Sequence, residues 1–263
     1  MNSERAVNAD EERADIESES KPFRPFRSLL SYYLSCYLDV TGHIQRTKNR
    51  LVAMNKSTEI GEWPREEERS YLEVYEQQKT RLTNKLLREA KKHPDYKWMS
   101  ELYGMGPYCL ALFLDKVDIE KARTVSSLWR FCGLAVFNGK RQGMVKGQKR
   151  DYCSVLKAAV LQHIGQMTLI RCRVEPYYSL YLKSKEYYQG IYPKWTKLHL
   201  HLAARRHMAK IYLEHLWRRW RTEHNLPARD IYVIERLGHT TYIPSRDPGA
   251  DIVPERASVA DLI

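Results

Sequence analysis

Two long stretches near the start of the chain, in which apolar residues recur at helical spacing, constrain the fold most. The first runs from about Ser28 to Asn55, with polar residues filling the other face. The second begins near Pro64, a residue favoured in the first turn of a helix, and continues to about Lys92. Together they predict a helical hairpin, or coiled coil, over residues 28–94. Two helices alone bury too little apolar surface, so we expect the hairpin to pack on a second copy, as a homodimer, or on a neighbouring domain.

The remainder of the chain divides into a compact part and two tails. Residues 95–225 have shorter apolar stretches separated by glycine and proline, which predicts a compact helical domain. Residues 1–27 have few large apolar residues and are predicted to be a disordered acidic tail. Residues 226–263 contain several prolines and are predicted to be an extended tail. We therefore predict an all-α fold, a long helical hairpin followed by a compact helical domain.

The charge of the chain points to a polyanionic partner. The formal net charge is +12, although the first 20 residues hold seven acidic side chains against two arginines. The positive charge is therefore concentrated in the middle of the chain, where it would attract a polyanion, most commonly nucleic acid; we expect DNA, with a structured RNA as the alternative. A cationic surface that serves only solubility is the alternative.

The composition also favours some compartments and sites over others. No apolar run approaches the roughly 20 residues that a membrane span needs, so we expect no membrane contact and a cytoplasmic, nucleoid-associated protein. The five cysteines are widely spaced and none forms a CxxC pair, which predicts reduced thiols in the core. The histidines near residues 199–215 do not share one face at ligand spacing, so we expect neither a metal nor another cofactor.

The segment Leu102–Leu112 has the pattern of a helix-hairpin-helix motif. Gly104 and Gly106 form a Gly-x-Gly turn, and Pro107 opens the second helix. Such a turn lets the backbone approach a phosphate, which the free N–H groups of the second helix would face. An ordinary tight turn between two packed helices is the alternative. The basic context favours phosphate binding.

A glycine-rich basic loop follows at residues 138–150. Glycines allow such a loop to conform to a ligand while its cations neutralise phosphates. A solvated, mobile loop is the alternative. The cations predicted to bind nucleic acid here are Lys140, Arg141, Lys146, Lys149 and Arg150.

A third basic element is the helix predicted over residues 197–221. On a helical wheel Arg205 falls within its apolar arc, where an unpaired guanidinium would be costly. Arg205 therefore needs a partner, either a buried carboxylate or a phosphate drawn into the domain. The apolar arc consists of Leu198, Leu202, Ala209, Leu213, Leu216 and Trp220. The residues predicted to form a second phosphate-binding track on one flank are Arg206, Lys210, Trp217 and Arg221.

Aromatic residues are interleaved with lysines just before this helix. The mixture is suited to stacking unpaired bases, although aromatic residues at helical spacing more often belong to a core. The residues concerned are Tyr177, Tyr178, Tyr181, Tyr187, Tyr188, Tyr192 and Trp195, with Lys183, Lys185 and Lys194.

Several segments of this chain resemble, in their order and spacing, segments of the insertion-sequence transposases of the IS-one-ten type, also called the one-sixteen and nine-oh-two group. Residues 37–51, which end in Lys-Asn-Arg-Leu, resemble the opening of that family's coiled coil. The resemblance covers about Ser28 to Trp220. The other blocks that resemble the family are its helix-hairpin-helix at 102–117, the Phe-Cys-Gly-Leu segment within 126–134, the basic loop and following helix at 139–156, and the closing helices at 176–220.

The resemblance implies a recombination protein, but the family's catalytic groups are not matched. Members cut DNA at a composite site, formed by four acidic residues of an N-terminal RuvC-like domain and a nucleophilic serine of the C-terminal domain, with a guide RNA bridging two DNAs. We expect the segment before Ser28 to be too short for that domain, and the loop at 138–150 contains no serine. Ser154, the nearest hydroxyl, is a weak candidate because it falls in the next predicted helix.

These observations lead to three hypotheses. The leading one is a nucleic-acid-binding relative of the transposase C-terminal half that is catalytically inactive alone and acts in transposition, recombination or their regulation. The second is an active transposase subunit that is completed by a separate RuvC-like partner, with Ser154 or a tyrosine as nucleophile. The third is a coiled-coil adaptor that binds an acidic protein.

Overall fold

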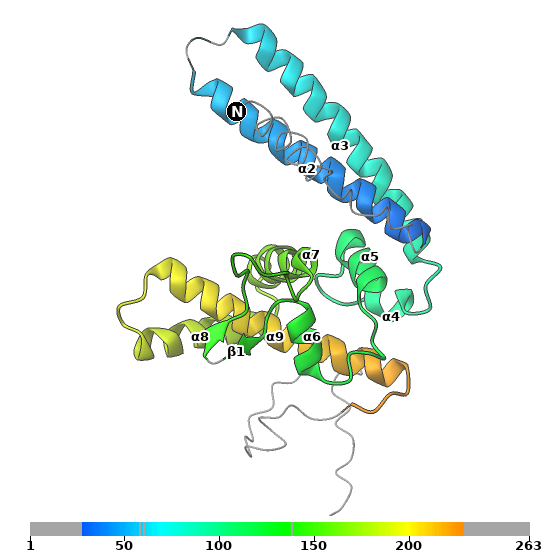
Figure 1. Ribbon diagram of the computed structural model, residues 1–263, viewed down its shortest axis with the longest axis vertical. Helices are drawn as coiled ribbons and strands as arrows, with labels where there is room; N and C mark the ends of the chain where they lie inside the picture. Colours follow the sequence, from blue (N-terminus) through cyan, green and yellow to red (C-terminus); the bar gives the residue numbers. More distant parts are fainter. Residues whose placement is uncertain (1–27, 58, 60, 138, 229–263) are drawn as a thin grey trace, which may run out of the picture.

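The computed structural model describes residues 28–57, 59, 61–137 and 139–228, and most of these residues are helical. The predicted all-α fold is therefore confirmed. A long helical hairpin projects from one side of a compact helical body (Figure 1). The predicted acidic tail at 1–27, and all but the first three residues of the predicted tail at 226–263, lie outside the described residues.

The hairpin consists of α2 (Leu29–Asn55) and α3 (Glu62–Ala90), close to the predicted bounds. Ser28 caps α2, because its hydroxyl oxygen accepts a hydrogen bond from the Ser31 N–H at 3.1 Å. At the tip, Arg65 of α3 donates to the backbone carbonyls of Met54 and Ser57, at the end of α2, where carbonyls lack the regular helical donor. The turn is thus held by a side chain that reaches back from the second helix.

The compact body begins at the base of the hairpin. Apolar residues near the hairpin base, such as Leu34 and Leu86, belong to the same buried core as the body, so the hairpin is anchored at one end. The remaining elements in chain order are α4 (Tyr96–Ser100), α5 (Pro107–Lys116), α6 (Val125–Phe131), β1 (Val136–Phe137), β2 (Lys140–Arg141), α7 (Ser154–Ala158), the π-helix η2 (Ala159–Ile170), α8 (Tyr177–Ile191) and α9 (Lys197–Glu223).

Helix α9 crosses the whole body and holds its parts together (Figure 1). Near its end Trp220 donates its indole N–H to the buried carboxylate of Asp95 at 2.8 Å, and Trp98 donates to the same carboxylate at 3.1 Å. Tyr212, about two turns earlier, donates to the backbone carbonyl of Tyr103 at 2.7 Å. The last helix is thereby tied to the segment that follows the hairpin.

Burial along α9 differs from the predicted pattern at three positions. Trp217 is buried and donates to the Ala122 carbonyl at 2.6 Å, and Arg221 is buried and donates to the carbonyls of Ile119, Ala122 and Pro227. Both residues therefore stabilise the segment before α6, and their predicted place in an exposed phosphate-binding track is wrong. Leu198, predicted to lie in the apolar arc, is 65% exposed in the first turn.

The five cysteines are all free thiols, but they differ in burial. Only Cys109 and Cys132 are buried, whereas Cys36 and Cys153 are partly exposed and Cys172 is exposed. The prediction of core thiols is thus correct for two residues. Within the described ranges, no helix combines the length and the apolar character that crossing a membrane requires.

Candidate nucleic-acid interface

The basic segment after α6 begins as a short β-hairpin. β1 and β2 pair antiparallel, with Val136 opposite Arg141 and Phe137 opposite Lys140. The buried side chain of Gln142 links the two ends of the loop. It accepts a hydrogen bond from the Ala135 N–H at 3.2 Å and donates one to Asp151 at 3.1 Å. The segment predicted to be a glycine-rich loop is therefore tethered at both ends, and Lys146 and Lys149 are exposed on the part between.

Cations from two other elements surround the foot of this β-hairpin. Lys157 of α7 donates to the Gln142 carbonyl at 3.0 Å. Arg206 of α9 donates to the carbonyls of Gly133 and Ala135 at 3.1 and 3.0 Å. Lys210, one turn further along α9, places its ammonium 4.0 Å from the centre of the Trp129 ring. We call the following six residues the cation cluster: Lys140, Arg141, Arg150, Lys157, Arg206 and Lys210.

The cation cluster has an excess of positive charge. None of its six members forms an ion pair with a carboxylate of the described residues. The pKa values of Lys157, Arg206 and Lys210 are lowered, first by burial and then by the charges of neighbouring cations, with Arg141 acting on the first two and Arg206 on both lysines. Asp151 and Glu214 counter the effect on Lys157 and Lys210 only in part. Such an arrangement is stabilised by an added anion.

A cavity of about 510 Å³ opens beside the cation cluster, between the β-hairpin and the turn that joins α8 to α9. Four cluster members line one part of it, and the side chains of Tyr188, Tyr192, Trp195 and His199 line another. A second cavity of about 420 Å³ lies under the loop itself, lined by Arg150, Lys149 and Phe137 among others. The structure thus brings together the predicted basic loop, two residues of the predicted track and some of the predicted stacking aromatics.

The aromatic residues of α8 divide into two groups. Tyr177 and Tyr181 are buried and hydrogen-bond His215 and His201 of α9, each at 2.8 Å, so they belong to the core. Tyr187, and Tyr192 directly after α8, are 64% and 43% exposed, but of these two only Tyr192 lines the larger cavity. Only aromatic rings towards the end of α8 are therefore exposed enough to stack on a base as predicted.

His207, which also lines the larger cavity, hydrogen-bonds Ser184 through Nδ1. The Ser184 hydroxyl lies 2.7 Å from the Leu180 carbonyl and 2.8 Å from Nδ1 of His207, and when it donates to the carbonyl it accepts from Nδ1–H of His207. Burial and the charge of Lys210 lower the pKa of His207, which favours the neutral ring. With Nδ1 protonated, Nε2 of the neutral ring is an acceptor, and no partner for it is found among the residues the structure describes.

Arg205 is buried within α9, as the helical wheel predicts, and its partner within the chain is a neutral side chain instead of a carboxylate. Its Nη1 donates to the side-chain oxygen of Gln162 at 3.2 Å, and its Nε has no hydrogen bond. No carboxylate in the described part of the chain pairs with it, so the interpretation as a buried ion pair is wrong. Burial lowers the pKa of Arg205.

The two glycines of the predicted helix-hairpin-helix lie away from the cation cluster. In Figure 1, α5 lies beside the base of the long hairpin, whereas β1 lies beside α8 and α9. Gly104 adopts a positive φ of 87°, and a Cβ added there would lie 2.9 Å from Ile164 of η2. Gly106 caps α5 and has open space around it. Packing within the protein therefore explains why position 104 is a glycine but does not explain the glycine at position 106.

Ser154, the weak nucleophile candidate, is the first residue of α7 rather than an internal helical residue. Its hydroxyl oxygen accepts a hydrogen bond from Arg150 at 2.7 Å. Neither an imidazole nor a carboxylate hydrogen-bonds it within the described ranges, so no general base is in place beside it.

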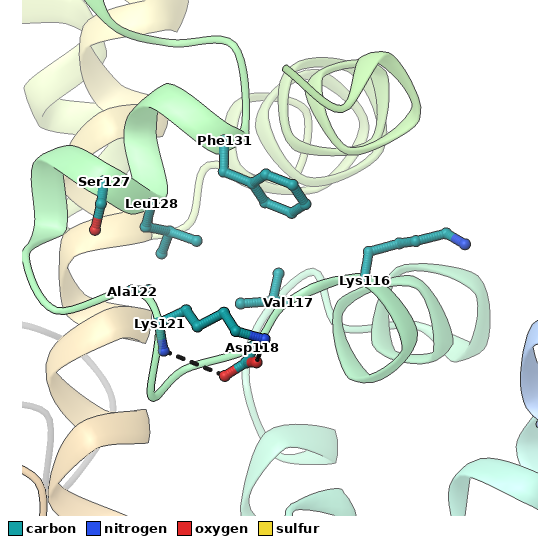
Figure 2. Close-up of a pocket in the computed structure, with 8 residues that line it drawn as sticks. All are labelled: Lys116, Val117, Asp118, Lys121, Ala122, Ser127, Leu128 and Phe131. Carbon is teal, nitrogen blue, oxygen red and sulfur yellow. Dashed lines mark hydrogen bonds and ion pairs between the residues drawn. The ribbon is translucent and has the colours of Figure 1, made fainter. Parts of the chain in front are cut away.

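A smaller cavity of about 350 Å³ lies elsewhere, between the end of α5 and α6 (Figure 2). Leu128, Val117 and Phe131 form its apolar wall, and Lys121 and Asp118 make an ion pair at 2.7 Å on its rim. Both of its cations are already paired, Lys121 with Asp118 and Lys116 with Asp115, so this cavity lacks the excess charge of the cluster.

Sequence reasoning missed two residues of the interface. Lys157 was not included because it stands outside the basic loop, although its position three residues after Ser154 places it on the first turn of the following helix. His199 was judged only as a metal ligand, yet it stands in the first turn of α9, and its ring stacks on Trp195, which precedes the helix.

No family model, curated protein or solved structure matches this chain.

Proposed function

We propose that this protein binds nucleic acid, principally DNA, through phosphates held at the cation cluster. The observation that supports the proposal best is the absence of carboxylate ion pairs for all six cations within the described residues, combined with pKa values that neighbouring cations lower. Arg206 and Lys157 are fixed by backbone carbonyls, so part of the cluster is held in position before a ligand arrives. Phosphate contacts of this type position a protein without reading sequence.

The resemblance to insertion-sequence transposases gives this proposal its biological setting. We infer a role in transposition, recombination or their regulation, by a protein that is catalytically inactive on its own and acts at the nucleoid in the cytoplasm. The hairpin would join two copies, and a structured RNA is the alternative ligand. Gly104 and Gly106, like Lys146 and Lys149, remain proposed contacts to the backbone. Arg205 remains a proposed ligand for a phosphate because its Nε has no partner.

The first test measures binding of the full chain to duplex DNA, a four-way junction and a structured RNA at two salt concentrations. The variant converts Lys140, Arg141, Lys146, Lys149 and Arg150 to glutamine. The control converts five exposed cations at the hairpin and its base to glutamine, namely Lys56, Arg81, Arg88, Lys91 and Lys97. For duplex DNA, the slope of log K against log salt becomes shallower by about 0.9 for each phosphate that the variant no longer neutralises.

We expect the loop variant to lose affinity and salt dependence while the control keeps both. Equal losses in the two variants would show that only net charge matters. If the unaltered chain bound none of the three ligands, the proposal would fail in favour of the adaptor for an acidic protein.

One observation favours a second candidate, the active transposase subunit. The Ser154 hydroxyl lies at the start of α7 with the Arg150 guanidinium on it, so an attacked phosphate would meet a cation beside the hydroxyl. With a separately encoded RuvC-like partner added, this candidate predicts a covalent protein–DNA adduct that Ser154→Ala abolishes. Recombination that persists in Ser154→Ala and in tyrosine variants would exclude it.

A further inference from the structure

We infer that the cavity between the β-hairpin and the α8–α9 turn binds one unpaired nucleotide, with its base stacked on an aromatic column and its phosphate at the cation cluster. This inference rests on the proposed function, since it names the form of nucleic acid that the same surface selects. It assigns the protein a preference for strands with an unpaired base over a fully paired duplex.

The aromatic column consists of three rings in parallel. Tyr192 and Trp195 stack with centroids 4.1 Å apart and planes 7° apart, and Trp195 and His199 stack at 4.0 Å and 6°. Aromatic pairs inside proteins commonly adopt tilted or edge-on arrangements. The buried Tyr177–Tyr212 pair does so at 61°. Parallel rings at this spacing reproduce the geometry with which bases stack on one another.

The ends of the column are accessible. Tyr192 is 43% exposed and His199 is exposed, and both line the cavity with Trp195. A base that enters the cavity can therefore continue the column by one layer. Stacking of this kind accepts any base, because every base has a flat π-face.

The other side of the same cavity supplies the charge that a nucleotide requires. Lys140, Arg141 and Arg206 line it together with Lys210. Its volume of about 510 Å³ lies within the roughly 300–1,000 Å³ typical of small-ligand sites. A paired base is stacked between its neighbours within a duplex and cannot enter a cavity of this kind, whereas an unpaired one can.

His207 adds a hydrogen-bond acceptor to the lining. Its Nδ1–H is used by Ser184, which leaves Nε2 as an acceptor without a partner among the described residues. A base amino group, a ring N–H or a ribose hydroxyl can supply the missing donor. The cavity thus combines a stacking surface, cations and one acceptor, the three features by which proteins recognise a splayed nucleotide.

The test compares Tyr192→Leu with the unaltered full chain. Leucine retains apolar contact but removes the ring that ends the column. The matched control is Tyr187→Leu, which alters a 64% exposed tyrosine of the same helix that does not line the cavity. The probes are a fluorescent single-stranded 10-mer, as DNA and as RNA, and the DNA duplex of the same sequence. The 10-mers also carry 2-aminopurine, whose fluorescence falls when it stacks.

We expect Tyr192→Leu to weaken single-strand binding about tenfold, with less quenching of 2-aminopurine, and to leave duplex binding unchanged. Tyr187→Leu should leave both unchanged. Unaltered single-strand affinity and quenching in Tyr192→Leu would overturn the inference. The proposed function would still stand in that case if the five-cation loop variant lost duplex binding. If the unaltered chain bound none of the three probes, the inference and the proposed function would both fail.

Discussion

At the scale of single residues, Gly104 and Gly106 show that two glycines of one motif are required for different reasons. Gly104 has a positive φ, and a Cβ there would meet Ile164 at 2.9 Å. Gly106 has a φ that any residue adopts and nothing near its missing Cβ. A sequence pattern treats the two alike, but only the first is explained by the protein's own packing.

The first prediction follows from this difference. Gly104→Ala should lower the free energy of unfolding by about 1–3 kcal/mol, because alanine is strained at positive φ and meets η2. Gly106→Ala should leave stability nearly unchanged. Chemical denaturation of both variants checks this. If α5 binds a phosphate, Gly106→Ala should instead weaken DNA binding, and an unchanged affinity would argue against a DNA-binding helix-hairpin-helix.

The second prediction concerns Arg205, a buried cation with a single neutral partner. Arg205→Met keeps the length of the side chain and removes a charge that no described carboxylate compensates. We expect the free energy of unfolding to stay level or to rise by about 1 kcal/mol, because buried charges are often replaced by apolar residues at no cost. Thermal unfolding measures this. A loss of more than about 2 kcal/mol would show that the Gln162 hydrogen bond compensates the burial.

At the scale of elements, the sequence predicts long periodic helices well and short irregular pieces poorly. α2, α3 and α9 begin and end within two residues of their predicted bounds, because many turns repeat the same apolar pattern. The pairing of β1 with β2 could not be predicted, since two residues per strand contain no periodicity. Trp217 and Arg221 were misplaced because a wheel for α9 alone does not reveal that the segment around Ile119–Ala122 covers them.

The same limit applies to the candidate site. The cations of the basic loop are recognisable from composition, but the cluster also needs Lys157 from the helix that follows the loop, and Arg206 and Lys210 from α9, which is distant in sequence. The column of Tyr192, Trp195 and His199 spans the end of α8 and the start of α9, so its geometry depends on the intervening turn. Sequence patterns describe elements, whereas the site arises from the way they pack.

The third prediction tests whether the basic loop must be held in position. Gln142→Ala removes the buried amide that bonds Ala135 and Asp151 without changing any charge. We expect faster tryptic cleavage after Lys146 and Lys149 and weaker DNA binding, with a loss of stability of about 1–2 kcal/mol. Full affinity in a loop that is cleaved faster would show that charge alone suffices.

At the scale of the whole molecule, the long hairpin bears apolar residues that the compact body does not cover. Tyr71 and Val74 of α3 are 47% and 51% exposed and, three residues apart, lie on the same face of the helix. Their position away from the hairpin base leaves them available to a second copy. This arrangement is consistent with the proposed homodimer, which buries apolar surface that one chain leaves in water.

The fourth prediction addresses that homodimer. Val74→Glu should convert a dimer into a monomer in sedimentation experiments, because it places a charge on the proposed contact. Thr80→Glu is the control, since it adds the same charge about 120° around α3 at another exposed position. If the Val74→Glu variant still forms a dimer, the contact lies elsewhere. If the unaltered chain is a monomer at all concentrations, the proposed homodimer is wrong.

The fifth prediction connects the cation cluster to the stability of the entire protein. Lys157 and Lys210 have lowered pKa values in the folded chain, so the folded state binds fewer protons than the unfolded state over the affected pH range. Stability should therefore rise with pH from the lowered pKa up to the ordinary lysine pKa of about 10.4. Lys157→Gln and Lys210→Gln variants should each show a weaker rise, whereas Lys91→Gln, at an exposed position of the hairpin base, should not alter it.

A bound polyanion should offset the repulsion between the cations of the cluster and thereby stabilise the folded protein. Duplex DNA that binds only the folded state at about 100 times its Kd should add about 2.7 kcal/mol of stability. Because the bound phosphate compensates the cations and raises the pKa values of Lys157 and Lys210 again, binding at a pH between their lowered pKa values and the ordinary lysine pKa should also be accompanied by proton uptake. Thermal unfolding with and without DNA, together with calorimetry in two buffers of different ionisation enthalpy, measures both effects. Stabilisation without proton uptake would place the bound phosphate away from these two lysines, on the exposed part of the loop around Lys146 and Lys149.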